Sequence, residues 1–503
     1  MKILLLFITV IVVSACSVNE QTCNCESNFD WVKKTFEEND AGFQYIIDKK
    51  GQTAYNAHNQ LTTDKIKTAN TLTECAGLLN EWLMFFRSGH LGIELLTSEK
   101  SRYKMTYKKG VYETKKVRIS QFADYLDTKE DANYEGVWEI IGGMYTIGIK
   151  KEGENYIGFI IESIDDTRKL SMIKMIIEYY RMKSRIVKLK IEQYDEKLKT
   201  TFYMHDHTPV ESGKPELIGN NYLHAGQFIL KRLNPIFPKD TLDLLFEKYL
   251  NSKSSQFAYI EELNEKTFYL RIPSFEIEYK YIIDKMLTDY KEEILKTDNL
   301  IIDLRDNGGG SSVSYKELIP LLYTDSIRIT NVEYLSSKLN NQTFLEYSYA
   351  IRHHCGLYFD IKSREWAQIV YDKLIRCKNG RFVALSDETF HIIRQDTIYE
   401  YPKNVGIIIN EGCASTTEGL LFIAKQSNKV KLFGAPTYGA FDTSSVNCVE
   451  SPCKEFRLWY CMSRNLCISE FAIDDIGMQP DYYFDETIPQ YKWVEYVNEI
   501  LNQ

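Results

Sequence analysis

NLIIDLRDNGGGS, residues 299–311, joins a short apolar run to three successive glycines. An apolar run that is closed by charge and glycine predicts a buried strand ending in a tight loop. Gly308, Gly309 and the glycine after them permit positive φ and close backbone approach, so their N–H groups can converge on one point. Such a loop can hold a phosphate or stabilise a developing oxyanion. A phosphate loop normally continues with Lys-Ser or Lys-Thr, whereas Ser311-Ser312-Val313 follows here.

Length and charge set the broad class of the chain. The 503 residues are 44% hydrophobic and 26% charged, with 11 Pro and 26 Gly, which is typical of a globular protein with room for two or three domains. The net charge of −9 provides no basic footprint for nucleic acid. We therefore expect no nucleic-acid partner.

The first sixteen residues have the pattern of an export signal. Lys2 precedes the apolar run 3–13, which is too short to span a bilayer but suits the core of a secretory signal. The run ends in Val-Ser-Ala-Cys16, which resembles the lipobox of bacterial lipoproteins, although an ordinary signal peptide with an incidental cysteine is the alternative. We expect a signal peptide over 1–15, a lipid on Cys16 and a polar tether over 16–28. The protein would then be anchored in the bacterial cell envelope, facing the periplasm or the outer surface.

Cysteine usage agrees with export. Ten cysteines remain when Cys16 is set aside, and an even number in an oxidising compartment indicates disulfides. Cys448 with Cys453, and Cys461 with Cys467, are close enough in sequence to staple local loops. A zinc site at these four residues is less favoured, because no CxxC pair and no nearby histidine supports it. We expect no metal.

Periodicity divides the rest of the chain into three regions. Residues 29–99 carry apolar side chains at helical spacing, whereas 100–250 contain runs and alternations typical of antiparallel strands. From residue 256 to 503 strands and helices alternate, which predicts an α/β domain. We expect a helical N-terminal region, a separate β-rich module and an α/β core, in that order.

A second strand exit lies about a hundred residues after the glycine loop. Residues 405–410 predict a buried strand, and the turn 411–419 leads into an apolar helix. Ser415 therefore sits at a strand-to-helix junction, where the helix dipole and first-turn N–H groups favour negative charge. Ser415 could also serve only as the N-cap of that helix.

Four ordered motifs resemble those of the S41 family of serine peptidases, which includes the C-terminal processing proteases and the tricorn core protease. The motifs are IDLRDNGGG, the NEGCASTTE turn, LFGAPTYG over 432–439 and GMQPD over 477–481. The resemblance covers about residues 256–490 and implies a crotonase/ClpP-like α/β peptidase core. It also implies that Ser415 is the nucleophile and that N–H groups of Gly308 or Gly309 and of Thr416 form an oxyanion hole.

The same resemblance bears on the base that a serine nucleophile needs. The processing-protease branch carries a lysine in T-x-G-K, and this chain has Ala440 at that position. The tricorn-like branch uses a histidine from the N-terminal part of the chain, which His90 matches in the loop RSGHLG. A lone loop histidine is by default a solvated residue, so only the resemblance makes it catalytic. Asp474 and Ser88 would orient it, although the family has Glu for Asp474 and a serine adjacent to its histidine.

The implied activity is that of a lipid-anchored serine endopeptidase that acts on peptides or unfolded proteins without a cofactor. The alternative is a lipoprotein that binds peptides or other ligands on this fold without cutting them, since relatives include retinoid-binding proteins. The absent lysine favours that alternative. The β-rich module lies where many members insert a PDZ domain, but it lacks a clear carboxylate-binding signature.

Overall fold

The computed structural model describes residues 24–96, 113–142, 145–163, 184–194, 197–203, 209–226, 228–351 and 360–503. The expected signal peptide, Cys16 and the first part of the expected tether lie outside these residues. Contacts divide the chain into unit 1, which contains Met1–Glu99 and Tyr259–Tyr483, and unit 2, which contains Lys100–Ala258 and Phe484–Leu501. Within the part described, the helices are all too short or too polar to cross a membrane.

The predicted α/β class, with a helical N-terminal region and a β-rich module, is confirmed. The expected boundaries and the contact-based units differ in two places. The helical region belongs to the same unit as the α/β core, and residues 484–501 belong with the β-rich module instead of the core. Both differences arise from packing between segments that are distant in sequence, which periodicity does not reveal.

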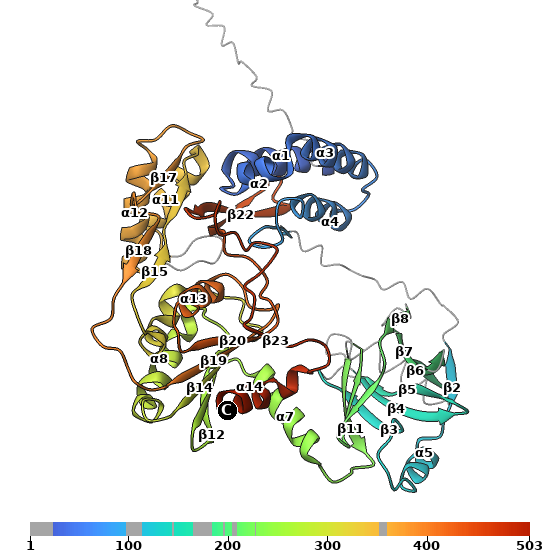
Figure 1. The fold of residues 1–503 in the computed structure, drawn as a ribbon. Coiled ribbons are helices and arrows are strands. Elements are labelled where there is room, and N and C mark those ends of the chain that lie inside the picture. Colours follow the sequence, from blue (N-terminus) through green and yellow to red (C-terminus); the bar gives the residue numbers. More distant parts are fainter. Residues whose placement is uncertain are drawn as a thin grey trace, which may run out of the picture. The chain divides into compact units, whose positions relative to one another are not determined.

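The N-terminal helices of unit 1 are amphipathic and pack on a sheet. Phe29, Val32 and Phe36 form the buried face of the first helix, and Trp82 of the fourth contacts two of these rings. The first helix also packs against strand β22 (Figure 1). The helices are α1 (Cys25–Asn39), α2 (Phe43–Lys50), α3 (Gln52–Ile66) and α4 (Leu72–Leu83).

A six-stranded sheet in the order β12-β13-β14-β19-β20-β23 forms the centre of unit 1 (Figure 1). All neighbours are parallel except the pair β12–β13. Every residue of β14 is buried, as expected for a central parallel strand. The strands are β12 (Tyr259–Asn264), β13 (Thr267–Arg271), β14 (Asn299–Asp303), β19 (Asn404–Ile409), β20 (Val430–Gly434) and β23 (Tyr482–Tyr483).

A second sheet of unit 1 has the long strand β22 between β1 and β21. Leu458 of β22 pairs with Ile93 on one side and Val449 on the other. The strands of this sheet are β1 (Gly92–Leu95), β16 (Val332–Leu335), β17 (Phe382–Ala384), β21 (Thr443–Glu450) and β22 (Phe456–Asn465). The other elements of unit 1 are η1 (Ile277–Tyr279), α8 (Lys280–Asp289), α9 (Lys291–Ile294), η2 (Ser312–Leu318), α10 (Ile319–Leu322), β15 (Ile327–Thr330), α11 (Lys338–Tyr349), α12 (Ile361–Leu374), β18 (Phe390–Ile393) and α13 (Thr416–Ala424).

A buried ion pair joins the helical region to the second sheet. The Arg87 guanidinium donates to both carboxylate oxygens of Asp40 at 2.8 and 2.6 Å. The same carboxylate accepts from the N–H groups of Gly42 and of Cys461 in β22. Because a buried charge is tolerated only when it is paired and hydrogen-bonded, Asp40 and Arg87 fix the ends of α1 and α4 against this strand.

The cysteines agree with the disulfide prediction only in part. A disulfide joins Cys25 of α1 to Cys75 of α4, and Cys448 and Cys453 are also disulfide-bonded. The expected staple between Cys461 and Cys467 is wrong, because both thiols are free and buried. Cys461 lies within β22, and the Cys467 Sγ lies 3.2 Å from the Thr330 hydroxyl. Their separate surroundings explain why closeness in sequence does not pair them.

Unit 2 contains a ten-stranded antiparallel sheet in the order β8-β7-β6-β5-β4-β3-β11-β10-β9, with β2 paired to β6. Trp138, Ile147 and Leu189 belong to its core. The strands are β2 (Thr114–Lys116), β3 (Gly136–Ile140), β4 (Tyr145–Glu152), β5 (Asn155–Ser163), β6 (Ser184–Tyr194), β7 (Lys197–Tyr203), β8 (Pro209–Ser212), β9 (Glu216–Ile218), β10 (Tyr222–Ala225) and β11 (Phe228–Asn234). The helices are α5 (Ile119–Leu126), α7 (Thr241–Ser254), η3 (Gln490–Lys492) and α14 (Trp493–Leu501).

Candidate active site

The central sheet brings the glycine loop and the Ser415 turn together. Strands β14 and β19 are parallel neighbours, with Ile302 opposite Ile407. Their carboxyl ends therefore meet at one edge of the sheet, where ligand sites of open α/β sheets lie. The glycine loop follows β14, and the turn into α13 follows β19.

The Asn307 side chain holds these two segments against each other. Its amide donates to the Ile272 carbonyl, and its Oδ1 accepts from the Thr417 hydroxyl of α13 at 2.9 Å. Gly309 has φ +102°, and a Cβ there would lie 2.8 Å from the Ala414 carbonyl oxygen and 2.9 Å from the Thr416 nitrogen. Only glycine allows this approach, so the glycine loop is in direct contact with the turn that carries Ser415.

Ser415 occupies a strained position at the start of α13. Its φ of 57° lies in the left-handed region, which is uncommon for a residue with a side chain. A serine on a sharp, strained turn between a strand and a helix is also the arrangement of the nucleophile in α/β-hydrolases. A backbone strained in this way persists only when surrounding hydrogen bonds hold it in place.

Glu418 supplies one of those hydrogen bonds and joins the turn to a second loop. The buried carboxylate accepts from the N–H groups of Ser415, Gly439 and Ala440 at 2.8–3.0 Å and from the Thr437 hydroxyl at 2.5 Å. Burial raises the pKa of Glu418, and these donors act in the opposite direction. Glu418 therefore ties the Ser415 turn to the loop 437–440, beyond the dipole role that a first-turn glutamate usually has.

His90 faces Ser415. Its Nε2 lies 2.9 Å from the Ser415 Oγ, and its Nδ1 lies 2.8 Å from the Thr443 carbonyl oxygen. A carbonyl can only accept, so Nδ1 must carry the proton of a neutral imidazole and Nε2 is left as an acceptor. His90 is therefore in the tautomer that can take a proton from the Ser415 hydroxyl.

The surroundings of His90 keep its imidazole neutral. The pKa of His90 is lowered to about 4, mainly by burial and also by the positive charge of Arg87. The hydrogen bond to the Thr443 carbonyl acts in the opposite direction. A histidine with this pKa is uncharged at neutral pH. It can then act as a general base without first losing a proton.

The two residues expected to orient His90 lie elsewhere. The Asp474 Oδ1 accepts from the N–H groups of Phe441 and Asp442, and the contact expected with His90 Nδ1 is made by the Thr443 carbonyl instead. Burial, and then the Asp442 carboxylate, raise the pKa of Asp474 to about 7. Ser88 donates through its N–H and its hydroxyl to Asp475 Oδ1, both at 2.7 Å, so it anchors the loop of His90 without touching the imidazole.

The loop of His90 fills the space beside Ala440. A Cβ on Gly89 would lie 2.4 Å from the Ala440 Cβ, and the Tyr438 hydroxyl donates to the Ser88 carbonyl. Small side chains at 89 and 440 are therefore a condition for bringing His90 to Ser415. Any side chain larger than hydrogen at residue 89 would therefore require the loop that carries Ala440 to shift.

The expected oxyanion donors differ in availability. The Gly309 N–H donates to Asn307 Oδ1 at 3.0 Å. Among the described residues, no acceptor is bound to the N–H groups of Gly308 and Thr416. The N–H groups of Gly308 and Thr416 are therefore both available to an oxyanion. In the alternative pair, Gly309 with Thr416, only the Thr416 N–H is available.

These groups together fit acyl transfer. A serine hydroxyl beside a neutral imidazole supplies a nucleophile and its base, and unoccupied N–H groups next to a helix N-terminus can stabilise an oxyanion. In the described part of the chain, no group of three or more His, Cys, Asp or Glu side chains is arranged to hold a metal ion.

Thr443, Asn307 and Glu418 are site residues whose contacts the sequence did not reveal. Thr443 contributes its backbone carbonyl, for which no side-chain signal exists. Asn307 stands inside the glycine motif, where an asparagine commonly has only a turn role, and its contact with α13 depends on the fold.

We expect Glu418→Gln to loosen the Ser415 turn. The new side-chain NH₂ group would face N–H and O–H donors that now bind a carboxylate oxygen. Each buried polar group left without a partner lowers the stability of the fold by about 1–3 kcal/mol. The free energy of unfolding in urea should fall by about that amount, and labelling of Ser415 by a fluorophosphonate should slow. Glu411→Gln, at an exposed glutamate in the same turn, is the matched control. Equal stability and labelling in both variants would contradict the assigned role of Glu418.

We expect the His90 imidazole to titrate at about pH 4. The ring is neutral above its pKa, so its Cε1 proton resonance should stay constant from pH 8 down to about 5 and shift only below that, whereas an unperturbed histidine shifts near about 6.5. NMR titration checks this, with the resonance identified by its loss in His90→Gln. A midpoint at about 6.5 would show that burial does not act on His90 as described.

Comparisons with known proteins give a family match for part of the chain. Residues 266–484 match the model of Peptidase family S41. Mature CPAF complexed with lactacystin has the same fold, with 11% identity, a TM-score of 0.50 and coverage of 95% of this chain and 97% of that chain. The photosystem II D1 C-terminal processing protease is 12% identical (TM-score 0.36; coverage 96% and 98%), and the tricorn protease is 12% identical (TM-score 0.36; coverage 95% and 36%).

A search of curated proteins gave no match. The family match includes the glycine loop, the Ser415 turn and the loop that Glu418 binds. Residues 266–484 of this chain therefore match peptidase family S41, the family whose motifs the sequence resembles.

Proposed function

We propose that this protein is a serine endopeptidase with Ser415 as nucleophile and His90 as base. The observation that carries the proposal is the 2.9 Å contact between His90 Nε2 and Ser415 Oγ, with Nδ1 held by a carbonyl. Family S41 membership of residues 266–484 supports a peptidase of the serine type. The substrates would be peptides or unfolded proteins.

In the proposed reaction, Ser415 Oγ attacks a peptide carbonyl while His90 Nε2 takes the hydroxyl proton. The N–H groups of Gly308 and Thr416 stabilise the oxyanion, and His90 returns the proton to the leaving amine. Water then hydrolyses the acyl-enzyme by the same steps in reverse. The Thr443 carbonyl keeps the imidazole in one tautomer, as the aspartate does in a Ser-His-Asp triad, but it adds no full negative charge.

We expect the purified wild type to hydrolyse casein. In both Ser415→Ala and His90→Ala the hydrolysis rate should fall by about 10⁴-fold or more, because removal of either member of a serine–histidine pair has effects of this size. Peptide release followed by fluorescence checks this, with folding verified by circular dichroism. Ser348→Ala and His391→Ala, which replace the same residue types away from the site, should keep full activity.

The outcomes separate the alternatives. Activity that survives His90→Ala would remove the histidine from the mechanism and keep the peptidase. A wild type that cuts neither casein nor other unfolded proteins would favour a ligand-binding lipoprotein on the same fold.

We also propose that the protein is exported and anchored by lipid at Cys16, in the bacterial cell envelope. The apolar run 3–13 and the Val-Ser-Ala-Cys16 sequence support this. Radioactive palmitate fed to bacteria that express the full chain should label wild type and leave Cys16→Ser unlabelled, with Cys23→Ser as the control. Equal labelling of wild type and Cys16→Ser would contradict the anchor.

A further inference from the structure

Two aspartates beside the candidate active site bind each other's backbone. The Asp442 carboxylate accepts from the N–H of Asp474 at 2.9 Å and from the N–H of the preceding residue at 3.0 Å. The Asp474 Oδ1 accepts in turn from the N–H of Asp442 at 2.9 Å and from the N–H of the preceding residue at 2.8 Å. These reciprocal hydrogen bonds clamp residues 441–443 to residues 473–475.

Each of the two clamped segments also holds the loop of His90. The Thr443 carbonyl, at the end of the first segment, accepts from His90 Nδ1 at 2.8 Å. The Asp475 carboxylate, at the end of the second, accepts from the N–H and the hydroxyl of Ser88 at 2.7 Å. A shift of one segment against the other would therefore pull on the imidazole and on its own loop in different directions, and His90 would lose its place beside Ser415.

The pair of carboxyl groups has room for one proton. Both oxygens of Asp442 and the Oδ1 of Asp474 accept from backbone N–H groups, whereas no donor from the described residues reaches Asp474 Oδ2. Two carboxyl groups that share a buried site do not both ionise at low cost. Burial, and then the Asp442 carboxylate, raise the pKa of Asp474 to about 7. Asp474 Oδ2 can carry the proton without disturbing any of the hydrogen bonds of the clamp.

The charges around the pair do not replace this proton. A cavity of about 30 Å³ borders both aspartates, and its other titratable lining residues are Tyr45, Lys49, Lys50, Arg87 and Asp475. Burial raises the pKa of Asp442, and its backbone donors and the charges of Lys49 and Arg87 act in the opposite direction. Lys49 is exposed, however, so solvent screens its charge. Burial also raises the pKa of the nearby Cys461 thiol to about 12, so this group stays neutral.

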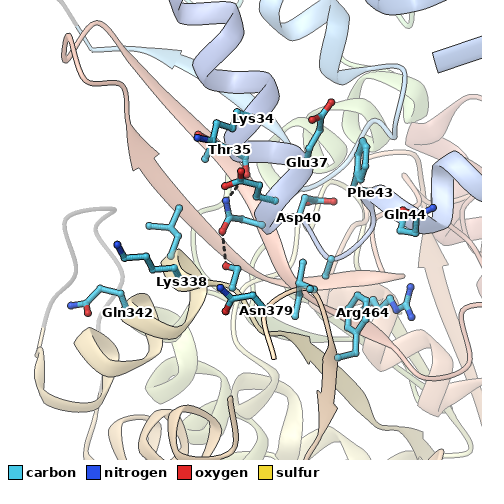
Figure 2. A pocket seen from close by; sticks show the side chains of 18 of the residues that line it. Lys34, Thr35, Glu37, Asp40, Phe43, Gln44, Lys338, Gln342, Asn379 and Arg464 are labelled. Carbon is cyan, nitrogen blue, oxygen red and sulfur yellow. Dashed lines mark hydrogen bonds between the residues drawn. The ribbon is translucent and has the colours of Figure 1, made fainter. Parts of the chain in front are cut away.

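Arg87 is already committed to another carboxylate. Asp40 lies beside a separate hollow of about 960 Å³ (Figure 2), and both of its oxygens accept from the Arg87 guanidinium. Such a bidentate pair uses most of the charge of the guanidinium. The two aspartates of the clamp therefore depend on their own proton.

We propose that Asp442 and Asp474 are positioning residues for His90, and that their clamp is closed while the pair holds one proton and opens when both carboxyl groups are charged. Opening withdraws the Thr443 carbonyl from His90 Nδ1, and the proton passes to solvent. Since the pKa of Asp474 is about 7, the clamp is closed below about pH 7 and opens as the pH rises above it. The effect on catalysis rests on the proposed function, whereas the clamp itself does not.

Two substitutions of Asp474 separate the closed clamp from a missing one. Asp474→Asn keeps an oxygen for both N–H groups and places an NH₂ group where the protonated oxygen lies, so it imitates the closed form at every pH. Asp474→Ala removes the acceptor. In a Ser-His-Asp triad, by contrast, an asparagine in place of the aspartate is strongly damaging.

The first measurement is the rate at which a fluorophosphonate labels Ser415 in the full-length protein, from pH 5 to 9. Above about pH 7 the wild-type rate should fall about tenfold per pH unit, as for any step that needs one proton in place. Asp474→Asn should show no such fall, and at pH 6 it should be labelled about tenfold or more faster than Asp474→Ala. Asp387→Asn, at an exposed aspartate away from the site, should follow the wild-type profile.

The second measurement needs no activity. The NMR signal of the His90 Nδ1 proton should be present at pH 6 in wild type and in Asp474→Asn and absent in Asp474→Ala. Above about pH 7 it should be lost in wild type alone, as the Thr443 carbonyl withdraws.

The proposal is overturned if Asp474→Asn is labelled as slowly as Asp474→Ala at pH 6, because a charged carboxylate is then required. It is also overturned if wild type and Asp474→Asn have the same pH profile, because the pair then holds no functional proton. If wild type is neither labelled nor active on casein, the proposed function fails. The Nδ1 proton signal then decides the clamp by itself.

Discussion

The buried carboxylate of Glu418 is the interaction on which the candidate active site depends. It accepts from the backbone of the Ser415 turn and from that of loop 437–440, so one side chain fixes two segments that leave different strands. A carboxylate without these donors would be costly in such surroundings, and the donors would be equally costly without it. The strained Ser415 backbone is held by this mutual requirement.

The position of His90 also depends on loop 437–440, which Glu418 holds in place. Tyr438 belongs to the loop that Glu418 binds, and its hydroxyl reaches the Ser88 carbonyl. From the other side, the Asp40–Arg87 pair attaches the end of α4 to β22. The N-terminal helices are therefore part of the framework of the candidate active site, and their packing decides where the imidazole lies.

The sequence was sufficient to predict the two strand exits, because apolar runs that end in glycine or in a polar turn have a direct physical meaning. Ser415 and His90 could be named only through motifs and a family resemblance, and the structure brings these two together. Asp474 was assigned the orienting role because its spacing matched, yet its carboxylate turns to the N–H groups of 441 and 442. The group at His90 Nδ1 is a backbone carbonyl, which every residue has and no sequence pattern marks. The C-terminal helix was placed with the core because contacts between distant segments leave no periodic signal.

The contact between Gly89 and Ala440 has a consequence for how such a site can change over time. A lysine at residue 440 and a histidine from the N-terminal loop are two designs of catalytic base whose positions lie in adjoining space. A side chain added at residue 89 would meet Ala440, so the histidine loop and residue 440 cannot be changed independently of each other. Intermediates between the two designs would have a folded scaffold with an unassisted serine.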